Sequence, residues 1–246
     1  MKRIKSGEEF FLKSYLPMLN KNITDVFFDL DHTLWDFDRN SALAFQRIFQ
    51  TEKIYLDVVA FIEAYEPINL QYWKKFRDNL ITKEELRRGR LIEAFQQFNL
   101  EYSLSEIDFL SKRYIEELPV DNHLFVGTIQ ILEHLSPNYN LHIITNGFHE
   151  VQFSKLKNSG IQKYFRTITT SEEAGVNKPH SGIFELALSK ASVMPFQSIM
   201  VGDSLEADIH GARNIGMNTL FFNYKNEIVP KSERAIKNLF EIKLHL

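Results

Sequence analysis

Two carboxylates, Asp29 and Asp31, close an apolar run and are the residues of this sequence best placed to do chemistry. The run Val26-Phe27-Phe28 is β-branched and aromatic, which predicts a buried strand over residues 23–30. Charges at the end of a buried strand are costly unless something pairs with them. Ligands of open α/β sheets also bind at the carboxyl ends of strands. The pair therefore indicates a metal or catalytic site, although a surface turn containing two acids would show the same pattern.

Polar side chains follow two later predicted strands in the same way. One strand ends in Thr145-Asn146-Gly147, and another is followed by Asp203-Ser204, with Asp208 in the opening of the next helix. Lys178 stands just ahead of Pro179, which suits the first turn of a helix, where free N–H groups favour anions. Because the carboxyl ends of parallel strands share one edge of a sheet, we expect these groups to meet there.

These residue types suit phosphoryl transfer. Asp29 and Asp203 offer the hard oxygen ligands that Mg²⁺ prefers. The metal and Lys178 would offset repulsion among the carboxylates and keep a nucleophile ionised. Thr145 and nearby backbone amides can donate hydrogen bonds to phosphoryl oxygens. One carboxylate can attack phosphorus, while Asp31 can protonate the leaving oxygen and later deprotonate water.

The elements that would position these groups form two parts. After residue 119, strands alternate with helices, which predicts an α/β fold with a parallel sheet. Residues 36–118 are almost entirely of helical pattern, so the chain divides into an N-terminal extension 1–22, a core 23–35 and 119–246, and a helical insert 36–118. Residues 8–19 have roughly helical spacing, and we expect residues 1–17, which carry no motif, to be dispensable. Further strands are expected over 140–145, 165–170, 198–202 and 218–223, and helices over 40–50, 57–79, 83–99, 105–118, 127–135, 150–157, 182–191 and 205–215.

The insert is the part of the chain that could select a substrate, because the core groups grip only phosphate and metal. It is rich in aromatic residues, most of which fit a helical bundle core, and its two basic clusters, 74–77 and 87–90, fit a solvated face. Some of these aromatic and basic residues could instead reach the substrate, because bases stack on aromatic rings and arginine can donate two hydrogen bonds to one acceptor group. The candidates are Tyr65, Tyr72, Trp73 and Phe76 for stacking, and Arg87, Arg88 or Arg90 for the donor.

Composition narrows the class of protein. The 246 residues carry 29 basic and 32 acidic side chains, so no global charge favours a nucleic acid polymer or a membrane surface. There is no cysteine, which excludes disulfides and thiolate chemistry, and no apolar run approaches the roughly 20 residues of a membrane span. We therefore expect a soluble, cytoplasmic globular protein, and we expect it to be a monomer or a homodimer. No catalytic role is expected for any histidine: His32 fills a motif position, and the others singled out lack metal-ligand spacing, namely His142, His149, His180 and His210.

The ordered motifs DLDHT (29–33), ITNG, NKP and GDSLEAD resemble those of the haloacid dehalogenase-like hydrolase superfamily. The resemblance implies a Rossmann-like, doubly wound parallel sheet of order 3-2-1-4-5 with an all-helical cap inserted after the first strand. It also implies a role for each motif residue. Asp29 corresponds to the nucleophile and Asp31 to the general acid/base, whose backbone carbonyl also binds Mg²⁺. Thr145 and Lys178 correspond to the motif threonine and lysine, Asp203 to the metal-binding acid, and Asp208, with Ser204 beside it, to an orienting group.

The second aspartate of the first motif favours one branch of that superfamily. The dehalogenases lack it and use no metal, whereas this chain has Asp31. The motifs ITNGF, SEEAGVNKP and GDSLEADIHGARNIGM look like those of nucleotidases that act on pyrimidine and noncanonical nucleoside monophosphates. The resemblance thus implies a Mg²⁺-dependent phosphomonoesterase with an aspartyl-phosphate intermediate, and Asn146 and Gly147 are expected to bind substrate. Alternatives are a phosphatase of small sugar or organic-acid phosphates, a phosphomutase, and a non-catalytic phosphate-binding regulatory protein, for which a full set of catalytic carboxylates would be superfluous.

Overall fold

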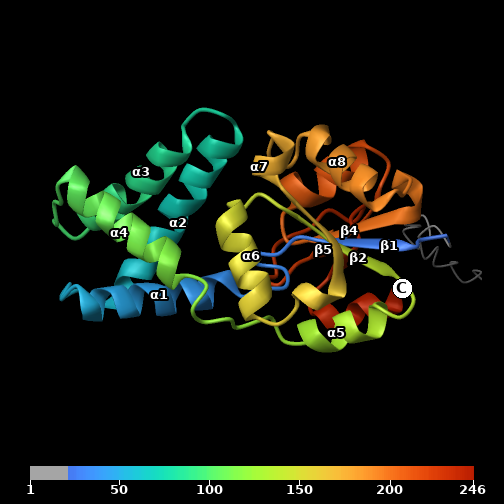
Figure 1. Cartoon of the computed structure of the whole chain (residues 1–246), viewed down its shortest axis with the longest axis horizontal. Helices are drawn as coiled ribbons and strands as arrows, with labels where there is room; N and C mark the ends of the chain where they lie inside the picture. Colours follow the sequence, from blue (N-terminus) through green and yellow to red (C-terminus); the bar gives the residue numbers. More distant parts are fainter. Residues whose placement is uncertain (1–21) are drawn as a thin grey trace, which may run out of the picture.

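A six-stranded parallel sheet forms one part of the molecule, and four helices form the other (Figure 1). The computed structural model describes residues 22–246, so the helical spacing over 8–19 and the dispensability of 1–17 lie outside the described residues. The strand order is β3-β2-β1-β4-β5-β6, which confirms the expected 3-2-1-4-5 and adds one short edge strand. The strands are β1 Asp25–Phe28, β2 Asn140–Thr145, β3 Phe165–Thr170, β4 Ser198–Gly202, β5 Asn218–Phe222 and β6 Ala235–Ile236.

Strand β1 lies at the centre of the sheet, paired with β2 on one side and β4 on the other. Its side chains alternate between the two faces. Phe28 belongs to the apolar cluster that includes Ile131 of helix α5 (Thr128–Leu135), and Phe27 to the cluster that includes Phe184 of helix α8 (Ser181–Ala191). Helices therefore cover both faces of the sheet, which explains why β1 is apolar without interruption.

Two helices of the core differ from their sequence-based expectation. The helix expected over 205–215 is a π-helix, Leu205–His210, followed by the short helix α9, Gly211–Asn214. Helix α8 begins at Ser181 after its N-cap His180, so Pro179 is not its first residue. Lys178 precedes a cis peptide bond to Pro179 and lies outside the first turn of α8. The core helices are α5 Thr128–Leu135, α6 His149–Asn158, α7 Ser171–Ala174, α8 Ser181–Ala191 and α9, with 3₁₀ turns at Gln162–Tyr164, Pro195–Gln197 and Leu239–Leu244.

The four helices between β1 and α5 pack on one another and are called the cap from here on: α1 Phe37–Thr51, α2 Val58–Arg77, α3 Lys83–Gln96 and α4 Leu104–Glu117. Each begins at a side-chain N-cap, and Thr82 and Ser103 form capping boxes with the glutamates three residues on. Aromatic rings fill the space between the helices: Phe45, Phe49, Phe61, Tyr65, Phe95 and Tyr114 are all buried. The exact division at 36–118 stays a prediction. Among residues 22–246, no helix has the length and apolar character needed to cross a membrane.

Two chain segments connect the cap to the sheet, and Asn40 ties them together. Its carboxamide donates to the carbonyl oxygens of Asp36 (2.8 Å) and His123 (2.9 Å) and accepts from the His123 N–H (2.9 Å). Asn40 is fully buried, so these bonds are shielded from water. The outgoing and returning segments are therefore fixed to each other where they leave the sheet, beside Asp29 and Asp31.

Candidate active site

Lys178 joins two carboxylates at the carboxyl edge of the sheet. Its ammonium group lies 2.7 Å from Asp29 Oδ1, 2.7 Å from Asp208 Oδ1 and 3.0 Å from the carbonyl oxygen of Ile144. Three acceptors match the three donors of an ammonium group. Burial acts to lower the pKa of Lys178, but the two carboxylates outweigh it and hold that pKa above its ordinary value. Lys178 therefore carries a positive charge inside the protein, although it is 2% exposed.

Asp29 and Asp203 remain short of positive charge. Burial raises the pKa of Asp29 to about 7, against the opposing effect of Lys178. Burial, and then the charges of Asp208 and Asp29, raise the pKa of Asp203 well above its ordinary value. Oxygen atoms of these three carboxylates lie within 4.8 Å of one another. One lysine cannot neutralise three carboxylates, and their oxygens are hard ligands, so the cluster fits a Mg²⁺ ion.

Asp208 differs from the other two carboxylates because both of its oxygens are engaged. Oδ1 accepts from Lys178, and Oδ2 accepts from the Ser204 N–H at 3.0 Å. Ser204 in turn caps the π-helix through the Ala207 N–H. A methyl group on Gly202 would lie 2.3 Å from Asp208 Oδ2, so only glycine leaves room for this carboxylate. These contacts suit an orienting role for Asp208, whereas Asp29 and Asp203 keep oxygens available for a metal.

Thr145 is held with its hydroxyl hydrogen free. Its Oγ1 accepts from the Gln152 amide at 2.7 Å and from the Gly147 N–H at 3.1 Å, and Thr145 lines the cavity described below. With both lone pairs occupied, the hydroxyl can only donate. The side chain of Asn146 binds the backbone of Lys178 instead, donating to its carbonyl oxygen (3.1 Å) and accepting from its N–H (2.7 Å). Substrate binding by Asn146 and Gly147 stays a prediction.

Asp31 is held by two residues that the sequence did not single out. Lys155 donates to Asp31 Oδ1 at 2.6 Å, and Gln152 donates to Oδ2 at 3.0 Å. Both lie on helix α6, and Lys155 is 1% exposed, with its ammonium 4.3 Å from the ring centre of Trp35. Their position in the sequence could have identified them. Residues 152 and 155 lie together with Val151 and Leu156 on the buried side of α6, where apolar residues are expected.

A cavity of about 440 Å³ separates these groups from the cap. Its floor contains all the core residues named from the sequence: Asp29, Asp31, Thr145, Asn146, Gly147, Lys178, Asp203, Ser204 and Asp208. Its roof comes from helices α1 and α2. The residues of α1 are Phe37, Asp38 and Ser41; those of α2 are Ile62, Tyr65, Glu66, Pro67, Asn69, Leu70, Trp73 and Arg77. The structure therefore brings every predicted core residue to one cavity that lies between the core and the cap.

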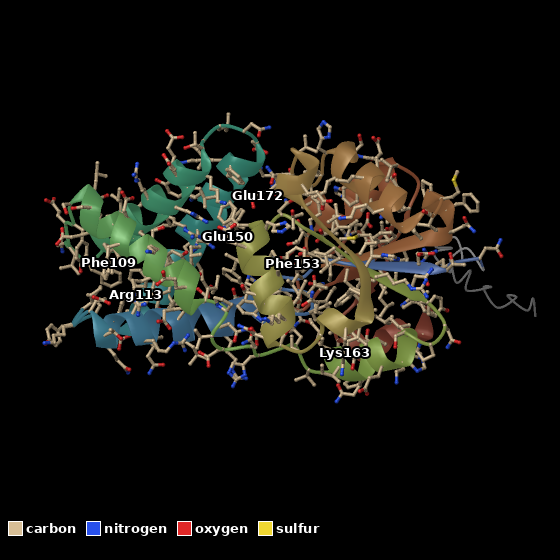
Figure 2. The ribbon with its side chains drawn as sticks, in the orientation of Figure 1. Phe109, Arg113, Glu150, Phe153, Lys163 and Glu172 are labelled. Carbon is tan, nitrogen blue, oxygen red and sulfur yellow. The ribbon has the colours of Figure 1, made fainter. Side chains whose placement is uncertain are left out.

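The three arginines proposed as substrate donors do not line that cavity. Arg87 donates to Glu150 at 2.9 Å, Arg88 to Asp108 at 2.6 Å, and Arg90 is buried inside the cap. Figure 2 labels Glu150 beside the cap, together with Glu172, which accepts from Lys83 at 2.7 Å. The ion pairs of Arg87 and Lys83 fasten helix α3 to the core, whereas that of Arg88 joins α3 to α4 within the cap. Of the four aromatic candidates, Tyr65 and Trp73 line the cavity, whereas Tyr72 and Phe76 do not.

Phe148 adds an apolar contact between cap and core. This residue follows Gly147 directly, is 3% exposed, and packs against Trp73 and Phe76 with ring centres 5.3 and 5.9 Å away. The ammonium of Lys83 lies 4.1 Å from the centre of its ring. Such cation–π contacts add to the burial of the ring. The segment that follows Thr145 is therefore in direct contact with the roof of the cavity.

A family model described as haloacid dehalogenase-like hydrolase matches residues 26–222, which spans the core motifs and the cap. The chain belongs to the haloacid dehalogenase-like hydrolases. Among relatives of this hydrolase, the pyrimidine 5'-nucleotidase PynA of Streptococcus pneumoniae is 33% identical over 80% of the chain and 83% of its own length. The pyrimidine 5'-nucleotidase YjjG of Escherichia coli is 32% identical over 84% and 88%.

Other relatives carry a different name or show the same fold. The glyceraldehyde 3-phosphate phosphatase of Pyrococcus furiosus is 30% identical over 83% of this hydrolase and 82% of its own length. The magnesium-bound crystal structure of HAD-hydrolase YfnB from Bacillus subtilis superposes with a TM-score of 0.81 at 27% identity, covering 91% of this chain and 98% of that one. The family resemblance expected from the motifs is thus confirmed, and with it the assignment as an enzyme of the phosphatase type.

Proposed function

We propose that the protein is a phosphomonoesterase that hydrolyses nucleoside monophosphates through an aspartyl-phosphate on Asp29. One observation carries the proposal: Asp29 and Asp31 face one cavity, but each is held by its own lysine. Two carboxylates in separate environments can take two roles, one as nucleophile and one as proton carrier. A protein that only bound phosphate would gain nothing from keeping both.

In the first step, an oxygen of Asp29 attacks phosphorus, and the bond from phosphorus to the leaving oxygen breaks. Lys178, 2.7 Å from Asp29, holds this carboxylate in place. The Thr145 hydroxyl donates to a phosphoryl oxygen as negative charge spreads over the group. Asp31 gives its proton to the leaving oxygen, so the alcohol departs neutral. A Mg²⁺ ion held by Asp29, Asp203 and the backbone carbonyl of Asp31 would supply further positive charge to the phosphoryl group.

In the second step, water attacks phosphorus of the aspartyl-phosphate, and Asp31 takes the proton of that water. The bond between phosphorus and Asp29 breaks, which releases inorganic phosphate, restores the carboxylate of Asp29 and leaves Asp31 protonated, as it was before the first step. Lys155 and Gln152 keep the Asp31 carboxyl at the same place in both steps, as each engages one of its oxygens. The same side chain can therefore act first as acid and then as base.

The substrate class follows from the roof of the cavity. A volume of about 440 Å³ lies in the range of about 300–1,000 Å³ usual for small-molecule sites. The roof presents the rings of Phe37, Tyr65 and Trp73, and a base can stack on such rings. The names of the relatives PynA and YjjG support the same class. The Pyrococcus furiosus relative supports a small sugar phosphate as the second candidate.

The test is phosphate release from a panel of monoesters, with and without Mg²⁺. The panel contains dUMP, dTMP and UMP, together with glyceraldehyde 3-phosphate, glucose 6-phosphate and phosphoglycolate. We expect the nucleotides to have the highest kcat/KM. A sugar phosphate preferred by more than about tenfold, which is a difference of about 1.4 kcal/mol, would overturn the nucleotidase assignment and leave the phosphatase chemistry in place. No release from any monoester would refute both.

A further inference from the structure

The cap contains a group of buried polar side chains that the catalytic steps leave unused. Arg90 is 2% exposed, yet no carboxylate within residues 22–246 lies at ion-pair distance from it. Its Nη1 donates to Asn69 Oδ1 at 2.9 Å, and its guanidinium lies 5.2 Å from the ring centre of Tyr114. The hydroxyl of Tyr65 also donates to Asn69 Oδ1, at 3.3 Å. Burying an unpaired charge costs free energy, so a buried Arg90 that only binds the Asn69 amide must have a use that offsets this cost.

These contacts fix the orientation of the Asn69 amide. Arginine has donors and no acceptor, so the group that faces Arg90 must be the carboxamide oxygen. Nδ2 then points away from both partners. Within the described chain this nitrogen has no hydrogen-bond partner, and it is not among the buried unpaired atoms. Because Asn69 lines the cavity, its NH₂ group is offered to whatever binds there.

The position of Asn69 on helix α2 places this donor beside an aromatic surface. Residues 65, 69 and 73 follow at four-residue steps and therefore share one face of the helix. Tyr65, Asn69 and Trp73 all line the cavity. A planar ring that stacks on Trp73 would present its edge to the donor one turn away.

We propose that Asn69, oriented by Arg90 and Tyr65, donates a hydrogen bond to a carbonyl oxygen on the base of the substrate. This inference rests on the proposed nucleotidase function and specifies the group that reads the base. The amide favours a base edge with an oxygen acceptor, as uracil, thymine and cytosine have. Arg90 is a positioning residue, because it acts through Asn69 and does not line the cavity.

The decisive variant is Asn69→Asp, which has nearly the same shape. Its carboxylate gives Arg90 a counter-charge, so the cap should fold, but the atom facing the cavity becomes an acceptor. The measured quantity is the ratio of kcat/KM for dUMP to that for 2-deoxyribose 5-phosphate, which lacks the base. We expect this ratio to fall by about tenfold to a hundredfold, the usual effect of leaving a polar partner unsatisfied.

Two further variants separate recognition from folding. Asn138→Asp makes the same chemical change on an exposed residue of the core and should leave the ratio unchanged. Arg90→Met should lower the ratio because the amide is no longer fixed, and Arg90→Lys should restore part of it, since lysine also only donates. Thermal unfolding of each variant shows whether the cap has folded.

The outcomes distinguish failure of the inference from failure of the proposed function. If the wild type hydrolyses both compounds but the ratio is unchanged in Asn69→Asp, the inference is wrong and the phosphatase assignment stands. If nothing is hydrolysed, calorimetric binding of dUMP decides the inference alone: affinity at least about tenfold weaker in Asn69→Asp than in Asn138→Asp supports it, and equal affinity overturns it.

Discussion

Replacing Lys155 by methionine should lower kcat strongly and the free energy of unfolding only slightly. Methionine fills much of the same space, but it removes the ammonium group that lies 2.6 Å from Asp31 Oδ1 and over the rings of Trp35 and Phe37. Of its side-chain hydrogen bonds within residues 22–246, Asp31 then keeps the one from Gln152, and its carboxyl can turn. Displacement of a catalytic group by about 1 Å can cost about a hundredfold in rate, so we expect kcat to fall by about 10- to 100-fold.

The effect on stability should be small because two contributions oppose each other. Removing one partner of a buried ion pair costs about 3–5 kcal/mol when the remaining charge is fully buried. The Asp31 side chain is 21% exposed, so water can solvate it in part. Burial also holds the pKa of Lys155 below its ordinary value despite Asp31, so removing the ammonium relieves a desolvation cost. We expect a net loss of about 1–2 kcal/mol, or a fall in Tm of about 2–8 °C.

The assay is steady-state hydrolysis of dUMP and of p-nitrophenyl phosphate, together with thermal unfolding. Lys157→Met is the matched control, because it makes the same change on an exposed position of helix α6. The loss in Lys155→Met should be larger for dUMP, whose leaving alkoxide needs a proton more than nitrophenolate does. A kcat within threefold of the wild type, or an equal loss for both substrates, would refute the positioning of Asp31 by Lys155.

Three further predictions concern the carboxylates. Asp29→Asn should reduce kcat by several orders of magnitude without unfolding the protein, and more than a few per cent of residual turnover in the phosphate-release assay would exclude Asp29 as nucleophile. EDTA should abolish turnover and Mg²⁺ restore it, and a Mg²⁺ titration of Asp203→Ala should show a much higher requirement; full activity in chelator would contradict the metal cluster. Burial raises the pKa of Asp29 to about 7 and that of Asp203 well above its ordinary value, and a metal binds only the ionised forms, so the apparent Mg²⁺ affinity should rise by at least about tenfold per pH unit below pH 7. Calorimetry between pH 5.5 and 8.5 would measure this, and a pH-independent affinity would contradict it.

The sequence predicted the sheet because β1, β2 and β4 are apolar runs whose pattern depends on burial alone. It did not predict β6, since Ala235 and Ile236 form a strand only by pairing with Phe221 and Phe222, and two residues carry no periodicity. The end of β1 was expected at residue 30, but the strand ends at Phe28, although the Asp29 N–H still donates to the carbonyl oxygen of Val201. Strand and helix ends depend on tertiary contacts more than on local pattern.

The active-site residues also divide into those that the local sequence pattern predicts and those that only tertiary contacts reveal. The motif residues were predicted because each follows a strand, and parallel strands bring their ends together. Lys155 and Asn69 were not, because nothing local distinguishes a lysine or asparagine in a helix from a solvated one. Lys155 becomes notable only when α6 turns it inward to Asp31, and Asn69 only when Arg90, 21 positions away, fixes its amide. Arg87 and Arg88 were misplaced for the converse reason, since their partners are carboxylates distant in sequence.

The central place of β1 in the sheet also determines the order in which the chain can fold. Its neighbour β2 begins at Asn140, which binds Asp25 across 115 positions, and β4 follows later still. All four cap helices are synthesised in between, and their contacts are mostly local, so they can form while β1 is unpaired. Phe27 and Phe28, fully buried in the native sheet, stay exposed until β2 emerges from the ribosome. A slow ribosome between residues 30 and 140 would prolong that exposure, and with it the interval in which β1 can aggregate.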